Sequence, residues 1–523
     1  MIAHPSGHWR SQWHPEQHRL VHETRFMESP SDDASTIADD VATLRGMGYS
    51  QELARRMGAF SNFAVSLSII CILAGGITSF HLGFCSVGGA AIGIVWPLCC
   101  AFSLVVALAM AQVASAFPTA GGLYHWAAIL GGRGWGWATA WFNLAGLIAV
   151  LAAINVGMFQ FVTGAFWPDA TISISQQIMA MMLITGSQAV LNHLGIRVTA
   201  WLTDFSGYWI LAVSALLTGA LLWHAPGLDF SRLVTFTNFS IESESCLPVW
   251  PETSSILWLS LLGSLLPAYT ITGFDASAHT AEETIGAAAN VPRGIVRSVL
   301  VSGIAGWVLL SSIVIAMPSL EGGAMRGPQV VFWTMRETLP SWLTLLLFGA
   351  IGVAQYLCGL ATVTSASRMA YAFARDGGLP ASHLLRQVSP RFQSPVAAIW
   401  AVAISATLFT VYTPVYSTIT AVCVIFLYIS YVLPTILGFL AYGKTWKNMG
   451  PWTMGAWYRP AAVVSAIGCL GLIVIGMQPP NEQAQWIVAG TIVVLLIGWF
   501  AGARKSFPGP PTGILTLSQQ AQP

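Results

Sequence analysis

Apolar residues lie along this chain in long uninterrupted runs rather than in alternation with polar ones. Twelve runs follow residue 60, and each reaches or approaches the roughly 20 residues that a helix needs to cross a bilayer. They lie at about 60–84, 88–113, 135–163, 175–193, 201–223, 256–280, 297–317, 341–372, 395–413, 415–441, 460–478 and 484–503. Because a spanning segment must satisfy its own backbone hydrogen bonds, the pattern predicts an all-α, polytopic membrane protein with twelve transmembrane helices.

The two ends of the chain lack such runs. Residues 1–50 contain several histidines and acids with little apolar periodicity, which predicts a largely disordered tail. The start does not resemble a cleavable signal peptide. We expect the last part of this tail, 41–57, to form an amphipathic helix that leads into a membrane domain at 51–505, and 506–523 to be a C-terminal tail.

Composition narrows the function classes. Charged residues make up 8% of the 523 residues, hydrophobic residues 55%, and the formal net charge is +1. A soluble protein carries about 25% charged residues, so this low share excludes a cytosolic enzyme and a disordered scaffold. The net charge near zero excludes a nucleic-acid binder, which needs an excess of basic residues. The cysteines show neither a CxxC pair nor metal-ligand spacing, so we expect no metal and no cofactor.

The placement of Lys and Arg predicts the orientation. If the N-terminus is internal, 16 of the 22 basic residues flank the inner ends of the runs and 3 lie in the distal tail. Only Arg232, Arg326 and Arg336 then fall in outer loops. Since basic residues favour the cytoplasmic side, both termini are predicted to be cytoplasmic. A plasma membrane and a vacuolar membrane both fit this pattern.

Two of the runs are interrupted. The first carries the pair Gly75-Gly76, and the sixth carries Gly273 among polar residues at membrane depth, shortly after Pro267. The two runs are five apart, so they would cross in opposite directions, and interruptions at matching places indicate an inverted-repeat secondary transporter. An unwound stretch exposes N–H groups that suit a carboxylate and carbonyls that suit a cation. Close helix packing is the alternative explanation for the glycines.

Asp275 is the one acid that we place well inside a run. A carboxylate at this depth costs several kcal/mol unless it is paired or neutral, which makes it a candidate gate, proton carrier or partner of a substrate ammonium. The alternative is a structural acid satisfied by a neighbouring backbone N–H. Glu282 and Glu283 follow at the inner end of the same run and would form an inner gate or a solvated cap.

Five stretches in order resemble one family. They are AGGITSF at 74–80, SAFPTAGGLY at 115–124, TGFDASAH at 272–279 with EET at 282–284, VPRGI at 291–295, and SRMAYAFARDGGLP at 367–380. With them the chain, from about 44 to 505, resembles the amino acid–polyamine–organocation superfamily. It is most similar to the amino acid/choline permease branch, which includes fungal GABA permeases and choline carriers.

The resemblance implies a leucine-transporter-like fold with inverted repeats at about 60–223 and 256–441 and peripheral helices at 460–503. It implies that substrate lies between the two broken helices, where Tyr269 closes over it, Asp275 is linked to gating and Asn155 faces the same cavity. By position, the substrate carboxylate would meet Ala74, Gly75, Gly76, Ile77 and Thr78, and the amino end would meet Thr272, Gly273 and Phe274.

The resemblance does not define which ion drives transport. Sodium-coupled members use hydroxyls of the eighth span, which here are Thr364 and Ser365, although such hydroxyls commonly bond the preceding turn. Some proton-coupled relatives use a lysine in the fifth span, and this run contains none. Our hypothesis is therefore coupling of a proton through Asp275.

These features predict the partners of the chain as a lipid bilayer, a coupling proton and a small molecule, with no nucleic acid. We expect a symporter that is not an enzyme and moves an amino acid or related amine of the GABA, choline or polyamine class by alternating access. The alternative is a transport-deficient nutrient sensor of the same fold.

Overall fold

A computed structural model describes residues 30–241, 249–412 and 416–511 of the chain. Within these residues every one of the twelve predicted runs is helical. The helices are α2 (Ala59–Ile69) with α3 (Phe80–Val87), α4 (Trp96–Ala116), α6 (Arg133–Phe166), α7 (Ile174–His193), α8 (Ile196–His224), α9 (Ile256–Gly263) with α10 (Leu265–Thr270) and α11 (Ala276–His279), α12 (Ala287–Ala316), α15 (Ser341–Arg375), α17 (Val396–Tyr412), α18 (Tyr416–Ala441), α19 (Tyr458–Gly476) and α20 (Glu482–Gly498).

The lengths and composition of these helices suit a membrane. Nine segments are long and apolar enough to cross one, and two shorter apolar segments, Ile256–Thr270 and Val396–Tyr412, occupy the sixth and ninth runs. The fourth run is α7, a helix of 20 residues. The described part of the chain is therefore an all-α polytopic membrane protein, as the apolar runs predict.

The helices differ in how deeply they lie in the bundle. Of the apolar window in α18, 72% is buried, and in the segment Ala59–Gly76 the share is 78%. In the last span, Glu482–Ser506, it is only 6%. All residues of α10 and α11 in the sixth run are buried as well, so the first, sixth and tenth runs lie in the centre and the last helix lies at the surface of the bundle.

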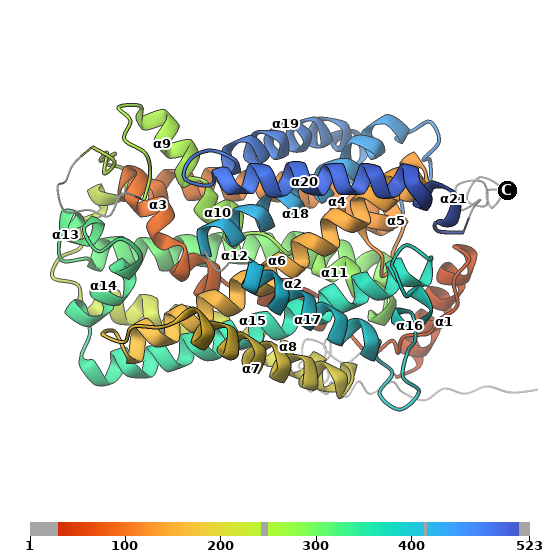
Figure 1. The fold of residues 1–523 in the computed structure, drawn as a ribbon, viewed down its shortest axis with the longest axis horizontal. Coiled ribbons are helices and arrows are strands. Elements are labelled where there is room, and N and C mark those ends of the chain that lie inside the picture. The colour runs from red at the N-terminus through yellow and green to blue at the C-terminus, as the bar shows by residue number, and fades with distance from the viewer. Residues whose placement is uncertain (1–29, 242–248, 413–415, 512–523) are drawn as a thin grey trace, which may run out of the picture.

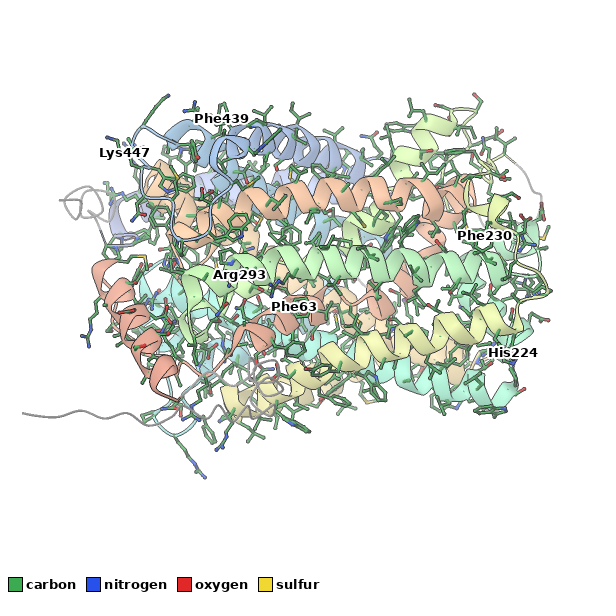
Figure 2. All side chains as sticks on the ribbon, turned by 180° about the vertical axis from the view of Figure 1, so that it is seen from behind. Phe63, His224, Phe230, Arg293, Phe439 and Lys447 are labelled. Atoms are coloured by element: carbon green, nitrogen blue, oxygen red, sulfur yellow. The ribbon has the colours of Figure 1, made fainter. Side chains whose placement is uncertain are left out.

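Short helices gather at the two ends of the bundle, some from the connecting segments and some from the ends of the runs (Figure 1). At one end lie α3, α9, α13 (Leu320–Ala324) and α14 (Val330–Thr338), and at the other α1 (Pro30–Gly46), α5 (Leu123–Gly131), α16 (Ser382–Leu385) and α21 (Arg504–Ser506). Figure 2 shows Lys447 at the second of these ends and His224 and Phe230 at the first. Following the predicted orientation, we call them the outer and the inner end.

The N-terminal segment differs from its prediction. The helix α1 spans Pro30–Gly46, whereas we expected a disordered chain with a helix at 41–57. The reason is tertiary, because Asp40 accepts hydrogen bonds from the N–H groups of Gly286 (2.7 Å) and Ala287 (3.2 Å) and so caps the start of α12. Residues 47–57 then run without a helix to Met57, which pairs with Thr284 in a parallel bridge. The predicted tail up to residue 29 lies outside the described residues.

Candidate functional site

The first run breaks before its glycine pair, which corrects our prediction. The helix α2 ends at Ile69, and after Ile70 and Cys71 a single π turn spans Ile72–Gly76. A Cβ on Gly75 would lie 3.1 Å from the Cα of Thr270. Gly75 therefore lets this turn approach α10 closely, so the packing explanation accounts for at least this glycine.

The sixth run breaks where we predicted. The helix α10 ends at Thr270, and α11 begins at Ala276. Gly273 has φ +86°, and a Cβ there would lie 2.3 Å from the Cγ2 of Ile69 at the end of α2. Only glycine fits this conformation and this contact without strain. The two breaks therefore face each other in the centre of the bundle.

Hydrogen bonds join the inner halves of the two broken helices. The Ser66 hydroxyl donates to the carbonyl of Phe274 (2.9 Å), and the N–H of Ser277 donates to the Ser66 oxygen (2.9 Å). Asn62 donates to the Ser277 carbonyl (2.9 Å) and to the Thr284 hydroxyl (2.9 Å). These bonds hold the inner half of α2 to the segment after the sixth-run break.

Asp275 lies at this break, fully buried, with three side chains around its carboxylate. The Nδ2 of Asn143 on α6 donates to Oδ2 (2.9 Å), and the hydroxyl of Tyr431 on α18 donates to Oδ1 (2.9 Å). The Nε2 of His279, one turn further along the same segment, lies 3.2 Å from Oδ2. The partners are side chains from three helices, which differs from the alternative of a lone acid satisfied by a neighbouring backbone N–H.

The tautomer of His279 follows from its other contact. Its Nδ1 lies 3.2 Å from the carbonyl of Ala120, and a carbonyl can only accept, so Nδ1 carries a hydrogen. The Nε2 atom then faces the Oδ2 of Asp275, and a hydrogen bond between them needs one further hydrogen, on the imidazole or on the carboxyl group. With this hydrogen the pair carries no net charge, and its loss would leave the Asp275 carboxylate in the core with neutral hydrogen-bond donors only.

Tyr431 also holds the shape of the break. Its hydroxyl oxygen accepts from the N–H of Gly273 (3.1 Å) while its hydrogen goes to Asp275. The ring of Phe274 packs against the ring of Tyr431, with centroids 4.9 Å apart. The backbone of the break and the carboxylate are therefore connected through one side chain of α18.

On the outer side of the breaks there is a hollow of about 270 Å³. It is lined by Ile77, Thr78, His81, Gly157, Gln160, Phe161, Pro328, Gln329, Phe332, Tyr416 and Ser417. The Tyr416 hydroxyl lies 2.7 Å from that of Thr78 and 3.2 Å from that of Ser79, and its ring meets Tyr269 edge to face at 6.4 Å. Ile77 and Thr78, which follow the π turn of the first run, belong to this lining, so the hollow lies next to the first break.

On the inner side two bidentate ion pairs join the broken segment to α15. Arg375 donates to both carboxylate oxygens of Glu282 (2.9 Å each), and Arg368 does the same to Glu283 (3.1 Å each). Both glutamates are fully buried, so they are not a solvated cap. Bidentate pairs of this kind are strong, but removal of one partner would leave the other charge unpaired in the core and destabilise the protein.

A second buried aspartate completes the inner end. Asp376 Oδ2 accepts from the hydroxyls of Tyr49 (2.9 Å) and Tyr124 (2.8 Å) and lies 3.0 Å from the Nε2 of His125. The guanidinium of Arg375 lies over the Tyr49 ring at 4.0 Å. The sequence places these residues in separate inner segments, so their assembly could not be read from it.

The charges at this end shift the pKa values of the two acids. Burial disfavours the ionised form of both carboxyl groups. At Glu282 the charge of Arg375 outweighs this effect, and at Asp376 the contacts with His125 and Arg375 outweigh it. The pKa of each carboxyl group therefore lies below its ordinary value. Burial raises the pKa of Tyr49, which keeps its hydroxyl protonated as a donor to Asp376.

Asn155 and Thr364, which we predicted at the substrate and ion sites, face a different helix. Asn155 donates to Thr185 (2.8 Å) and to Gln188 (2.9 Å) on α7, so its amide faces α7, and the prediction that it faces the substrate cavity is corrected. The hydroxyl of Thr364 donates to the Oδ1 of Asn192 (2.7 Å), again toward α7. Asn155 on α6 and Thr364 on α15 thus bond to α7, because polar side chains in a membrane find hydrogen-bond partners on neighbouring helices rather than in water.

The face of α15 toward the first break carries other groups. The Nε2 of Gln355 donates to the carbonyl of Leu73 (3.1 Å), and the thiol of Cys358 donates to the carbonyl of Ile69 (3.4 Å). Ser365 is buried, and its hydroxyl has no partner among the described residues. Gln355 was not predicted, since no spacing in the sequence shows which face of a long apolar helix meets a break. The described residues contain no group of three or more His, Cys, Asp or Glu that could hold a metal ion.

The fold and the site define a class of protein. Interrupted helices that face each other in the centre of a membrane bundle are a feature of secondary transporters. The chain belongs to the amino acid permease family, whose model matches residues 57–501. The family comprises transporters of amino acids or amines.

Individual relatives cover nearly the whole chain. Amino-acid permease BAT1 of Arabidopsis thaliana is 31% identical, over 90% of this chain and 96% of the relative. Amino-acid permease 2 of Neurospora crassa is 27% identical, over 92% and 90%. A putative polyamine transporter of Candida albicans is 25% identical, over 91% and 90%.

Proposed function

We propose that the protein moves an amino acid or a related amine across a membrane by alternating access, driven by protons. The observation that carries the proposal is the buried pair Asp275 and His279, whose Oδ2 and Nε2 atoms lie 3.2 Å apart directly at the break of the sixth run, a place where a proton could be exchanged. Tyr431 connects this carboxylate to the N–H of Gly273 in the break itself. A change in protonation at Asp275 would therefore alter the hydrogen bonds that shape the backbone around the substrate.

In this proposal the backbone around Ala74, Gly75, Gly76, Ile77 and Thr78 holds the substrate carboxylate, and that of Thr272, Gly273 and Phe274 meets the amino end. Tyr269 and Tyr416 close the path on the outer side. The arrangement, with a hollow outside and two ion pairs inside, corresponds to a carrier closed at its inner end. Release toward the inside then requires Arg368 and Arg375 to separate from Glu283 and Glu282.

Protons are favoured over sodium for a structural reason. The hydroxyl of Thr364 is directed to Asn192, and the face of α15 that meets the first break presents the thiol of Cys358 and the amide of Gln355. Sodium prefers several hard oxygen ligands, and a thiol is a soft one. Ser365 remains as one hydroxyl on this helix without a partner among the described residues.

Uptake into proteoliposomes tests the proposal. An inward proton gradient should drive accumulation of a labelled amino acid, a sodium gradient should not, and Asp275→Asn should abolish the gradient-driven part while leaving exchange measurable. Asp204→Asn is the matched control, because Asp204 is a half-buried membrane acid on α8 that bonds only Ser61 among the described residues. Full gradient-driven uptake by Asp275→Asn would show that the proton is carried elsewhere.

The same vesicles separate the transporter from a sensor of the same fold. A sensor would bind substrate, seen as a rise in the midpoint of thermal unfolding, without moving label into the vesicle. We expect both binding and accumulation, because the proposed outer closure at Tyr269 and Tyr416 and the inner ion pairs of Glu282 and Glu283 are connected through the breaks.

A further inference from the structure

A groove runs along the surface of the bundle between the last span and the start of α6. It has a volume of about 390 Å³, and every residue that lines it is apolar, aromatic or glycine. Neither of the two broken segments contributes to this lining, and the proposed transport function makes no use of the groove. Its occupant therefore has to be inferred from its own shape and surroundings.

The shape of the groove follows from the spacing of residues on α6. Gly134, Ala138 and Phe142 recur at every fourth position, which places them on one face of the helix. Gly134 and Ala138 have little or no side chain, so they leave a floor between the helices. A Cβ on Gly134 would lie 3.1 Å from the ring of Trp499. This row is about 12 Å long and so suits part of an extended acyl chain.

The groove opens toward the bilayer. Only 6% of the apolar window of the last span is buried, and Figure 1 shows α20 along the surface of the bundle, with α21 after it at the inner end. Trp135 is 50% exposed and Phe500 67% exposed at the rim of the groove. Tryptophan side chains near the end of a span are typical of the boundary between acyl chains and headgroups. A lipid with its headgroup at the inner end fits this arrangement.

Three basic side chains stand at the inner mouth of the groove. Arg504 and Lys505 directly follow the π turn Trp499–Ala503, and both are exposed without a partner among the described residues. Arg133 is exposed next to Gly134, and its Nη1 donates to the carbonyl of Phe507 (3.3 Å). This bond holds Arg133 beside the segment that follows Lys505, so the three charges lie at one place.

No acid in the adjoining sequence offsets these charges. The stretches 123–142 and 483–511 contain neither Asp nor Glu. Asp376 lies nearby, because its partner Tyr124 packs against Phe507, but it is buried and already bonded to Tyr124 and His125. The mouth thus carries positive charge directly beside an apolar groove.

This combination selects one class of lipid. A guanidinium and an ammonium bind the phosphate and carboxylate oxygens of an anionic headgroup, while the groove takes an acyl chain. A free phosphate ion would leave the groove uncovered, and a lipid without net charge would not neutralise the basic side chains. On the predicted orientation this mouth faces the cytoplasmic leaflet, where anionic lipids are found.

We propose that the groove between α6 and the last span binds one acyl chain of an anionic phospholipid, whose headgroup is held by Arg133, Arg504 and Lys505. The site is separate from the substrate path. The proposal goes beyond the proposed transport function and does not depend on it.

Native mass spectrometry of the purified, delipidated full chain tests the headgroup. With dioleoylphosphatidylserine and dioleoylphosphatidylcholine as probes, the chain should retain one phosphatidylserine with about tenfold higher affinity than phosphatidylcholine. Arg504→Gln combined with Lys505→Gln should reduce the retention of phosphatidylserine to that of phosphatidylcholine. Equal retention of both lipids by the wild type, or undiminished phosphatidylserine in this variant, would overturn the proposal.

A second double variant controls for general charge attraction. Lys444→Gln combined with Lys447→Gln removes the same charge from exposed positions at the same end of the bundle (Figure 2), outside the lining of the groove. It should retain phosphatidylserine as the wild type does. An equal loss in this variant would show unspecific attraction to the inner end and contradict a defined site.

Filling the groove tests the acyl chain. Ala138→Leu should lower the retention of phosphatidylserine severalfold, because the larger side chain occupies the floor. Gly490→Leu is the control, since Gly490 is exposed on α20 and a Cβ there meets nothing within 4 Å. If Ala138→Leu unfolds, Phe500→Ala removes part of the exposed rim and should lower retention in the same direction. Full retention in the folded groove variant, or a protein dimer in place of bound lipid, would overturn the proposal. Because these spectra need no transport, they remain decisive even if uptake fails.

Discussion

At the scale of single residues, two buried pairs of aspartate and histidine are found among the described residues. Asp275 meets His279 in the centre of the bundle, and Asp376 meets His125 at the inner end. The sequence singles out Asp275, because an acid inside an apolar run is rare. It gives no such signal for Asp376, which follows a helix in a segment that reads as an inner loop and is nevertheless buried.

Asp376 gives a pH-dependent prediction. Its pKa is lowered in the folded protein from an ordinary value of 3.8, so its ionised form contributes stability above that value and the contribution is lost as pH falls through the folded pKa. The midpoint of thermal unfolding should therefore fall below about pH 4 in the wild type. The Asp376→Asn variant should have a lower midpoint of thermal unfolding at neutral pH, and its midpoint should depend less steeply on pH below about pH 4. An equally steep dependence in the variant would assign the acid sensitivity to other groups.

At the scale of elements, the two breaks are where we propose that substrate binds. The sixth run breaks at Gly273 because φ there is positive and Ile69 leaves no room for a side chain. The first run breaks at Ile70 and Cys71, four residues before the glycine pair that attracted the prediction. Glycine in a membrane helix indicates either unwinding or close packing, and only the neighbouring helix distinguishes the two.

Gly273→Ala tests the sixth-run break. A non-glycine residue in this left-handed region costs about 1–2 kcal/mol, and the contact with Ile69 adds to it, so thermal stability and uptake should both fall. Gly219→Ala in α8 is the control, because a Cβ there meets nothing within 4 Å. If the Gly273 variant kept full stability and uptake, the break would be more adaptable than its geometry indicates.

At the scale of the whole molecule, the first and last described segments both pack at the inner end of the bundle. Asp40 of α1 caps α12, and a Cβ on Gly48 would lie 2.7 Å from the ring of Pro511. The two ends of the described chain therefore lie on one side, which agrees with the even number of predicted spans. The side itself depends on the basic residues and stays a prediction.

Cysteine labelling tests that side. In a sealed host cell a membrane-impermeant maleimide should label Phe230→Cys directly, and it should label Lys447→Cys only after permeabilisation. Both positions are exposed and lie at opposite ends of the bundle (Figure 2), and the seven described cysteines are buried, so Cys246→Ser gives a suitable background. The reverse pattern would invert the orientation.

The sequence by itself determined the class of fold, because an apolar run of about 20 residues has few alternatives to a membrane helix. It also determined the break at Gly273 and singled out Asp275, since positive φ and membrane depth restrict residue type locally. The five ordered motifs led to the same family as the comparisons.

Only the tertiary structure decided which side chains meet. Asn143, Tyr431 and His279 reach Asp275 from three helices, Arg375 lies 93 positions from Glu282, and Asn155 faces α7 rather than the substrate path. An apolar helix in lipid carries no periodic signal for the direction of its few polar groups. Those directions are set by the neighbouring helices, whose packing depends on contacts far apart in the chain.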